Sequence, residues 1–355
     1  MTHSQRQNFH AQRGFTLIEL MVALVLGLLV IGAAGGIFLQ NRRVYGSTEA
    51  VNRIQENQRS AFELLTRDIR EVAGNPCVKF SDMPIGMLIK VPDATFWSRF
   101  PAGVFGADGT GASGSDAVTL YSGSGRIFNV SLQKKPTDPI TVVNPAGTGT
   151  AGLAPGQPLL ICDADHATAF TATSITPSGT TIAIAHDSTG NCDSNLQVLP
   201  NGKALPPCGG VPYCFSLGVK PGTPPTATDT TNCPAGISLG PSYVLVPSDA
   251  QWTVEANGRN GNSLYRTSLG NRSEIAEGVT SMTIGYKISQ AGGYVNAATV
   301  AAANAWSQVL AVHVSVTFQA AQGALTQGDT RGTDNTVLTR TLDDYIALRN
   351  HQIIQ

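Results

Sequence analysis

An uncharged, mostly apolar run at residues 20–39 constrains this chain more than any other feature. As an α-helix it would be about 30 Å long, which matches the hydrocarbon core of a bilayer. Arg42 and Arg43 end the run, and residues 1–14 before it contain two arginines and no acidic residue. Because positive charge stays on the cytoplasmic side, we expect a membrane helix with the rest of the chain beyond the membrane.

The position of Gly14 indicates an anchor rather than a discarded signal peptide. A secretory signal has a shorter apolar region with a small-residue cleavage site after it. Here Gly14 precedes the apolar run, so cleavage there leaves the helix on the mature chain. Within the helix, the acid Glu19 costs about 2–3 kcal/mol unless it is compensated. It pairs with the α-amino group of Phe15, if the chain is cut after Gly14, or it lies among the lipid headgroups.

The segment from Arg13 to Leu24 reads RGFTLIELMVAL and resembles the prepilin processing motif of type IV pilins and type II secretion pseudopilins. This resemblance implies that residues 1–14 are a cytoplasmic leader that is cleaved off between Gly14 and Phe15. It implies a prepilin peptidase/methyltransferase as a partner, which also N-methylates Phe15. It further implies that Glu19 pairs with the terminal amine of a neighbouring subunit and sets the register of assembly.

The helical pattern continues past the apolar run, and we predict one helix over residues 15–72. Residues 15–39 form its transmembrane half, and residues 40–74 form an amphipathic periplasmic half that ends at Gly74-Asn75-Pro76. Charged pairs spaced four residues apart support it, such as Glu49 with Arg53. Its apolar stripe is expected to pack on a globular domain, with Gln58 filling one place among Val44, Val51, Ile54, Ala61, Leu65, Ile69 and Val72.

The remainder, residues 75–355, lacks helical periodicity and contains short alternating segments typical of strands. The fold class is therefore α+β: a long N-terminal transmembrane and stalk helix on a mainly antiparallel β-sheet head, as in pilins. Gly, Pro and Thr are frequent around residues 134–158 and 200–240, which we interpret as loop insertions. Strands are expected at 118–121, 127–132, 159–161, 181–185, 243–246, 282–288, 310–318 and 337–350.

Six cysteines occur, and five of them lie between residues 162 and 233. Their even number and the lack of a CxxC motif favour disulfides formed in an oxidising compartment. We predict a Cys162–Cys192 bond, because these two residues bracket an apparent strand pair. Spacing assigns no partner to the other four, which are Cys77, Cys208, Cys214 and Cys233.

Other motifs favour no catalytic, metal or cofactor site. Residues 109–114 satisfy GxGxxG, but a loop precedes them and a strand follows, unlike a dinucleotide site. The Cys162–His166 segment and His186 have metal-ligand residue types without a zinc-like spacing. The chain has a net charge of −1, and residues 162–249 carry two lysines against six aspartates. Nucleic acid is therefore not expected as a partner, and we predict a non-enzymatic protein without cofactors or metals.

The head resembles the minor pilin family called PilW at several short segments. These are Leu264-Tyr265-Arg266, residues 275–279, 284–286 and 306–314, and the ending at residues 346–350. This resemblance implies a subunit that waits in the inner membrane with its head in the periplasm. It would then join other minor pilins and the major pilin through the first helix and start a filament, at its tip. A type II secretion pseudopilin and a tip adhesin that binds a surface ligand remain as alternatives.

Overall fold

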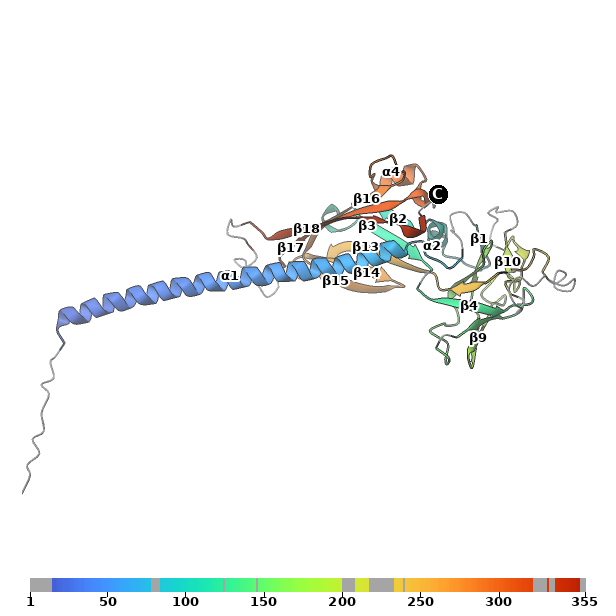
Figure 1. Cartoon of the computed structure of the whole chain (residues 1–355), viewed down its shortest axis with the longest axis horizontal. Coiled ribbons are helices and arrows are strands. Elements are labelled where there is room, and N and C mark those ends of the chain that lie inside the picture. The colour runs from blue at the N-terminus through green and yellow to red at the C-terminus, as the bar shows by residue number, and fades with distance from the viewer. Residues whose placement is uncertain are drawn as a thin grey trace, which may run out of the picture.

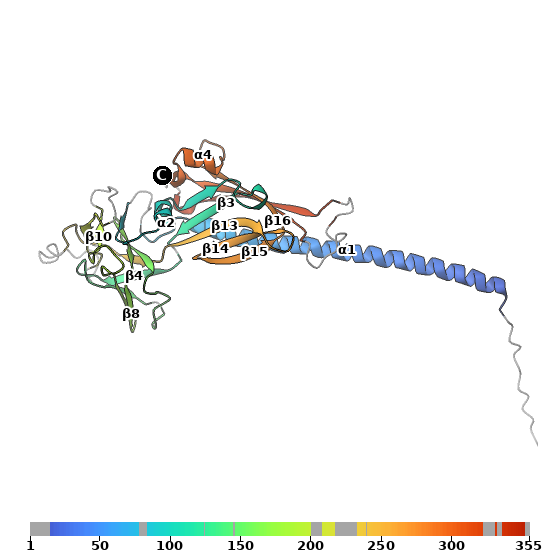
Figure 2. The same ribbon diagram turned by 180° about the vertical axis from the view of Figure 1, so that it is seen from behind.

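The computed structural model describes residues 15–77, 84–199, 208–216, 233–321, 331 and 336–351, apart from the single residues 124, 145 and 239. Its dominant element is one continuous helix, α1 (Leu17–Glu71), whose second half lies against a β-rich head (Figure 1). The first half projects from the head without touching it, as the reverse view also shows (Figure 2). The predicted α+β class is confirmed.

The sequence sets both ends of α1. Thr16 is the N-cap, and it forms a capping box with Glu19 at the third helical position. At the other end, Val72 caps the helix and Ala73 takes a left-handed conformation, with φ at 52°. The predicted helix over residues 15–72 is thus correct to within two residues. The predicted stripe is buried at Ile54, Ala61, Leu65, Ile69 and Val72, whereas Val51 and Gln58 are half-buried and Val44 is exposed.

Two antiparallel sheets pack against the second half of α1 and leave its other face exposed. The first has the order β15-β14-β13-β3-β2, and the second is β16-β17-β18. Their buried faces and α1 form one hydrophobic core. The bounds are β2 (Val104–Ala107), β3 (Ala117–Ser122), β13 (Ser248–Ala256), β14 (Asn262–Ser268), β15 (Asn271–Glu277), β16 (Val279–Lys287), β17 (Ala311–Gln319) and β18 (Thr339–Ala347).

A second lobe is inserted between β3 and β13. These strands pair with each other, and Ser122 lies opposite Ser248, so residues 123–247 leave and re-enter the sheet at adjacent positions. We call the described residues of this segment, with β1 added, the distal lobe. It has its own hydrophobic core and lies beyond the end of α1 (Figures 1 and 2).

The distal lobe is built on a sheet of order β1-β7-β6-β12-β4-β5-β9-β8 and a small β10-β11 pair. Among the described strands, only β1 and β7 pair in parallel. The bounds are β1 (Ile85–Met87), β4 (Ile127–Leu132), β5 (Ile140–Val143), β6 (Pro158–Cys162), β7 (Ala167–Thr171), β8 (Ser174–Ser178), β9 (Thr181–Ala185), β10 (Gln197–Val198), β11 (Val211–Pro212) and β12 (Tyr243–Leu245).

The short helices of the head were not predicted, because each spans less than two turns. In the described part of the chain they are α2 (Ala94–Arg99), α4 (Ala297–Ala302) and four 3-10 turns at Phe100–Ala102, Ala112–Gly114, Trp306–Gln308 and Arg349–His351. The eight strand segments expected from alternation all coincide with strands of the structure. The insertion expected at 134–158 is not entirely loop, since β5 lies within it between β4 and β9. Most of the one at 200–240 lies outside the described residues.

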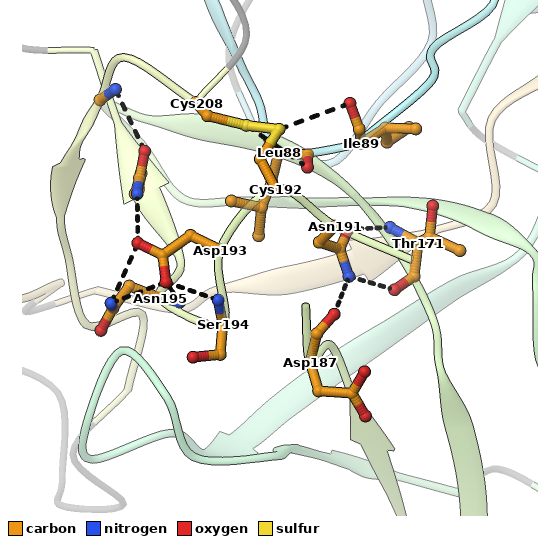
Figure 3. The surroundings of a disulfide bond; sticks show 12 residues. Leu88, Ile89, Thr171, Asp187, Asn191, Cys192, Asp193, Ser194, Asn195 and Cys208 are labelled. Carbon is orange, nitrogen blue, oxygen red and sulfur yellow. Dashed lines mark hydrogen bonds between the residues drawn. A yellow bond between two sulfur atoms is a disulfide. The ribbon is translucent and has the colours of Figure 1, made fainter. Parts of the chain in front are cut away.

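The predicted Cys162–Cys192 disulfide is wrong. The structure pairs Cys77 with Cys162, Cys192 with Cys208, and Cys214 with Cys233, at Cα–Cα distances of 6.1, 5.9 and 5.6 Å. Three strands, β7, β8 and β9, lie between these two cysteines, and β6, which ends at Cys162, pairs with β7 and β12 and not with β9. Cys162 instead meets the chain leaving α1, and Cys192 meets Cys208 beside Leu88 and Ile89 (Figure 3).

Candidate functional site

The start of α1 brings Glu19 close to the site predicted for cleavage. Its Oε2 accepts hydrogen bonds from the backbone N–H of Thr16 at 3.1 Å and from the Thr16 hydroxyl at 3.0 Å. The Thr16 hydroxyl in turn accepts from the backbone N–H of Glu19 at 3.4 Å. Within one chain, the carboxylate therefore folds back to the residue next to Phe15. Gly14, the other predicted cleavage residue, lies outside the described part of the chain.

The first half of α1 presents apolar side chains on every side. Phe15 is 89% exposed, and every large apolar residue from Leu17 to Leu39 is at least half exposed. Among the described residues, α1 is the one helix long and apolar enough to span a membrane, and no part of that stretch is buried in the head. So large an apolar surface requires lipid or other helices around it.

The glycines of this half are not needed for packing within the chain. A Cβ atom added at Gly27, Gly32, Gly35 or Gly36 would meet nothing within 4 Å, and the helix runs through all four without interruption. Small residues let helices approach one another closely in a membrane. These glycines have no packing role within the isolated chain, so they are free to let a neighbouring helix approach closely.

The second half of α1 is fixed to the head by a buried charge. Asp68 is only 6% exposed, and its carboxylate accepts from the Trp252 indole N–H at 3.0 Å. It also binds the guanidinium of Arg266, with its Oδ2 2.6 Å from Nε and its Oδ1 3.2 Å from Nη2. Trp252 on β13 is fully buried and Arg266 lies beside it on β14. This cluster holds the stalk in one orientation on the five-stranded sheet.

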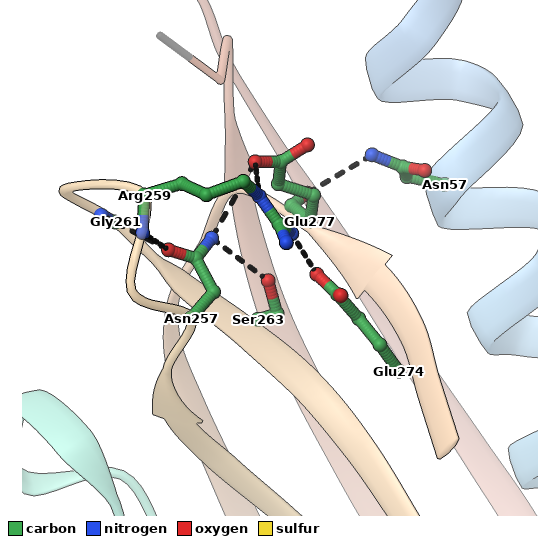
Figure 4. A network of polar contacts seen from close by, with 7 residues as sticks. All are labelled: Asn57, Asn257, Arg259, Gly261, Ser263, Glu274 and Glu277. Atoms are coloured by element: carbon green, nitrogen blue, oxygen red, sulfur yellow. Dashed lines mark hydrogen bonds and ion pairs between the residues drawn. The ribbon is translucent and has the colours of Figure 1, made fainter. Parts of the chain in front are cut away.

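Two adjacent amides on α1 attach it to both sheets. The Asn57 side chain donates to the carbonyl of Glu277 at the end of β15, at 2.9 Å (Figure 4). The Gln58 side chain donates to the carbonyl of Thr341 on β18, at 3.2 Å. Beside Glu277, Arg259 bridges the carboxylates of Glu277 and Glu274. In the sequence, Gln58 only interrupts the apolar stripe, and Asn57 has no distinguishing signal.

The GxGxxG segment and the Cys162–His166 segment, which the sequence offers as possible binding sites, form local turns and connections. The GxGxxG segment forms the connection between β2 and β3, where the backbone N–H of Gly109 donates to Asp116. In the turn after β6, Asp163 accepts from the backbone of His166 and from the Tyr213 hydroxyl at 2.7 Å. Burial by itself would raise the pKa of Asp163, but hydrogen bonds from His166 and Tyr213 lower that pKa below its ordinary value. Among the described residues, no three metal-ligating side chains converge.

Comparison with known proteins agrees with the geometry at the N-terminus. Residues 9–35 match the family model for the prokaryotic N-terminal methylation motif. No curated protein and no solved structure matches the chain. The motif, the exposed apolar helix and the disulfide-bonded sheet domain together support a structural subunit of the pilin or pseudopilin class, with a prepilin peptidase and other pilins as its partners.

Proposed function

We propose that this chain is a non-catalytic minor pilin of the PilW type that helps to initiate type IV pilus assembly. The observation that carries the proposal is the first half of α1. It is apolar on all sides and untouched by the head, and most of it lies within the match to the methylation motif at residues 9–35. An element of this kind is suited to leave a bilayer for a bundle of similar helices, because both environments cover its apolar surface.

In this proposal, residues 1–14 are removed on the cytoplasmic side and Phe15 is methylated. Residues 15–39 then hold the chain in the inner membrane, with the head in the periplasm, where disulfides form readily. On assembly, α1 packs beside the first helices of other minor pilins and of the major pilin. The carboxylate of Glu19, already directed to the chain start, pairs there with the terminal amine of a neighbour.

The distal lobe supports a position at the filament tip. It extends past the end of α1 along the direction of the helix (Figures 1 and 2). In a filament whose first helices run side by side, the next subunit outward would need that space. A subunit with nothing beyond it has no such conflict, and its distal lobe would be the first part to meet an external surface. The same position is compatible with a tip adhesin.

Deletion of the gene tests the assignment to a pilus. We expect most surface filaments to disappear while the major pilin stays in the membrane, because initiation rather than subunit supply is lost. Electron microscopy and immunoblots of sheared and membrane fractions measure this, with the full-length gene restored as control. Normal filaments together with lost enzyme secretion would contradict the proposal and assign the chain to a type II secretion system.

A further inference from the structure

An aromatic cluster lies on the outer face of the three-stranded sheet, away from the core. The inward side chains of β17, such as Val314 and Phe318, are buried, and His313 alternates with them on the outer face. Tyr345 on β18 is directly opposite His313, and the two rings stack with centroids 4.3 Å apart at 14°. Tyr294 closes the cluster, with its ring centroid 5.2 Å from that of Tyr345.

The cluster leaves one aromatic face open. His313 covers one face of the Tyr345 ring and Tyr294 meets it at a tilt, yet Tyr345 remains 60% exposed. The exposed area is therefore largely the second ring face. Tyr294 and Tyr345 touch each other, so the cluster is a platform rather than a cage.

A carboxylate stands beside this platform. Asp343 lies two residues before Tyr345 on the same face of β18, and its Oδ1 is hydrogen-bonded to the His313 ring. The Asp343 side chain is still 57% exposed. An open aromatic face and an accessible carboxylate on one strand both attract a cation.

The other sheet shows what completes such a pair. On the five-stranded sheet, Arg272 lies over the ring of Tyr265, with Cζ 3.6 Å from the centroid, and also pairs with Glu255. Tyrosine, carboxylate and arginine there come from three neighbouring strands of one chain. Tyr345 and Asp343 present the tyrosine and a carboxylate that pairs only with His313, and among the described residues no arginine lies over Tyr345.

We propose that Tyr345 and Asp343 form a receptor site for an arginine side chain of a neighbouring subunit in the filament. A guanidinium stacks flat on an aromatic ring and donates in the same plane to a carboxylate, which an ammonium does not match. β18 also flanks α1, where Gln58 binds the Thr341 carbonyl. A neighbour whose helix packs along α1 is thereby brought to the edge of this sheet, where β18 is the outermost strand. The inference rests on the proposed function, because it requires assembly with other subunits.

Photo-crosslinking in cells tests the site in the full-length chain. A benzoylphenylalanine replaces the exposed Ala347, two residues after Tyr345 on the same face. We expect an adduct whose mapped peptide, from a pilin subunit, contains an arginine. Tyr345→Leu and Asp343→Asn should each lower its yield by about five- to tenfold, whereas Tyr345→Phe, which keeps the ring face, should not. Leu269→Ala, at another exposed apolar residue, is the matched control for unspecific loss.

Charge exchange gives the decisive result. Asp343→Arg should abolish the adduct, and aspartate in place of the mapped partner arginine should restore it. Unchanged protein level and disulfide-dependent gel mobility exclude misfolding of the variants. The inference is overturned if the adduct forms with lipid or with a peptide that lacks arginine. It is also overturned if the yield of the adduct is the same in Tyr345→Leu as in the unchanged chain. If filaments still assemble in that case, the proposed function stands and only the arginine site is wrong.

Discussion

Glu19→Ala is expected to leave the chain in the membrane and to remove it almost completely from filaments. Insertion of the helix into the membrane becomes more favourable, because a carboxylate inside the apolar segment raises the free energy of insertion by about 2–3 kcal/mol. Assembly fails, because the amine of the neighbouring subunit loses its buried partner, and breaking a buried ion pair costs about 3–5 kcal/mol. We expect at least about a hundredfold less of this subunit in sheared filaments, measured by quantitative immunoblot against the membrane pool.

Two matched variants separate the charge of Glu19 from its role as a helix cap. Glu19→Gln keeps a side chain that can close the capping box but removes the charge, so it should fail like Glu19→Ala. Thr16→Ala removes the hydroxyl that bonds to Glu19 but keeps the charge, so it should assemble. Normal incorporation of Glu19→Gln would show that capping, and not pairing with an amine, is what assembly needs.

Asp68→Ala is expected to destabilise the head by about 3–5 kcal/mol. The change leaves the Arg266 guanidinium and the Trp252 indole N–H without the acceptor that holds both on α1. Denaturant unfolding of the full-length protein in detergent, followed by tryptophan fluorescence, measures the loss, since Trp252 is fully buried in this core.

The neighbouring residue supplies the control for Asp68. Arg67 is exposed, and its contacts with Asp68 and Glu71 are 3.8 and 3.9 Å long, so Arg67→Ala should change the free energy of unfolding by less than about 0.5 kcal/mol. The double variant Asp68→Leu/Arg266→Met should be more stable than Asp68→Ala, because no unpaired charge is then buried. A loss below about 1 kcal/mol for Asp68→Ala would contradict a buried anchor.

The elements that were predicted correctly are those with local signals. The stalk helix shows its period over many turns, and strands such as β17 alternate strictly between buried and half-buried residues. The capping box of Thr16 and Glu19 was not predicted, although its signal is equally local, because it needs only residues three apart. In each of these features, residues within four positions of one another in the sequence determine the local structure.

The features that were missed depend on residues far apart in the chain. The Cys162–Cys192 prediction failed because strand order, which spacing does not report, decides which cysteines meet. Asp68 has no distinguishing signal in the sequence, since its partners Trp252 and Arg266 lie almost two hundred residues away. Arg266 did belong to a segment noted for its resemblance to PilW, but the resemblance gave no role for it. Likewise, only the pairing of β3 with β13 shows that the distal lobe is an insertion between two neighbouring strands.

The most direct test of the central claim is the mass and sequence of the N-terminal peptide of the protein purified from native membranes. This account predicts a mature chain that begins at Phe15 and carries one methyl group on its α-amine. It also predicts that a substitution of Gly14 leaves the uncleaved chain in the membrane. A chain that still begins at Met1, or one that is cut after the apolar run, would contradict the assignment to the pilin class.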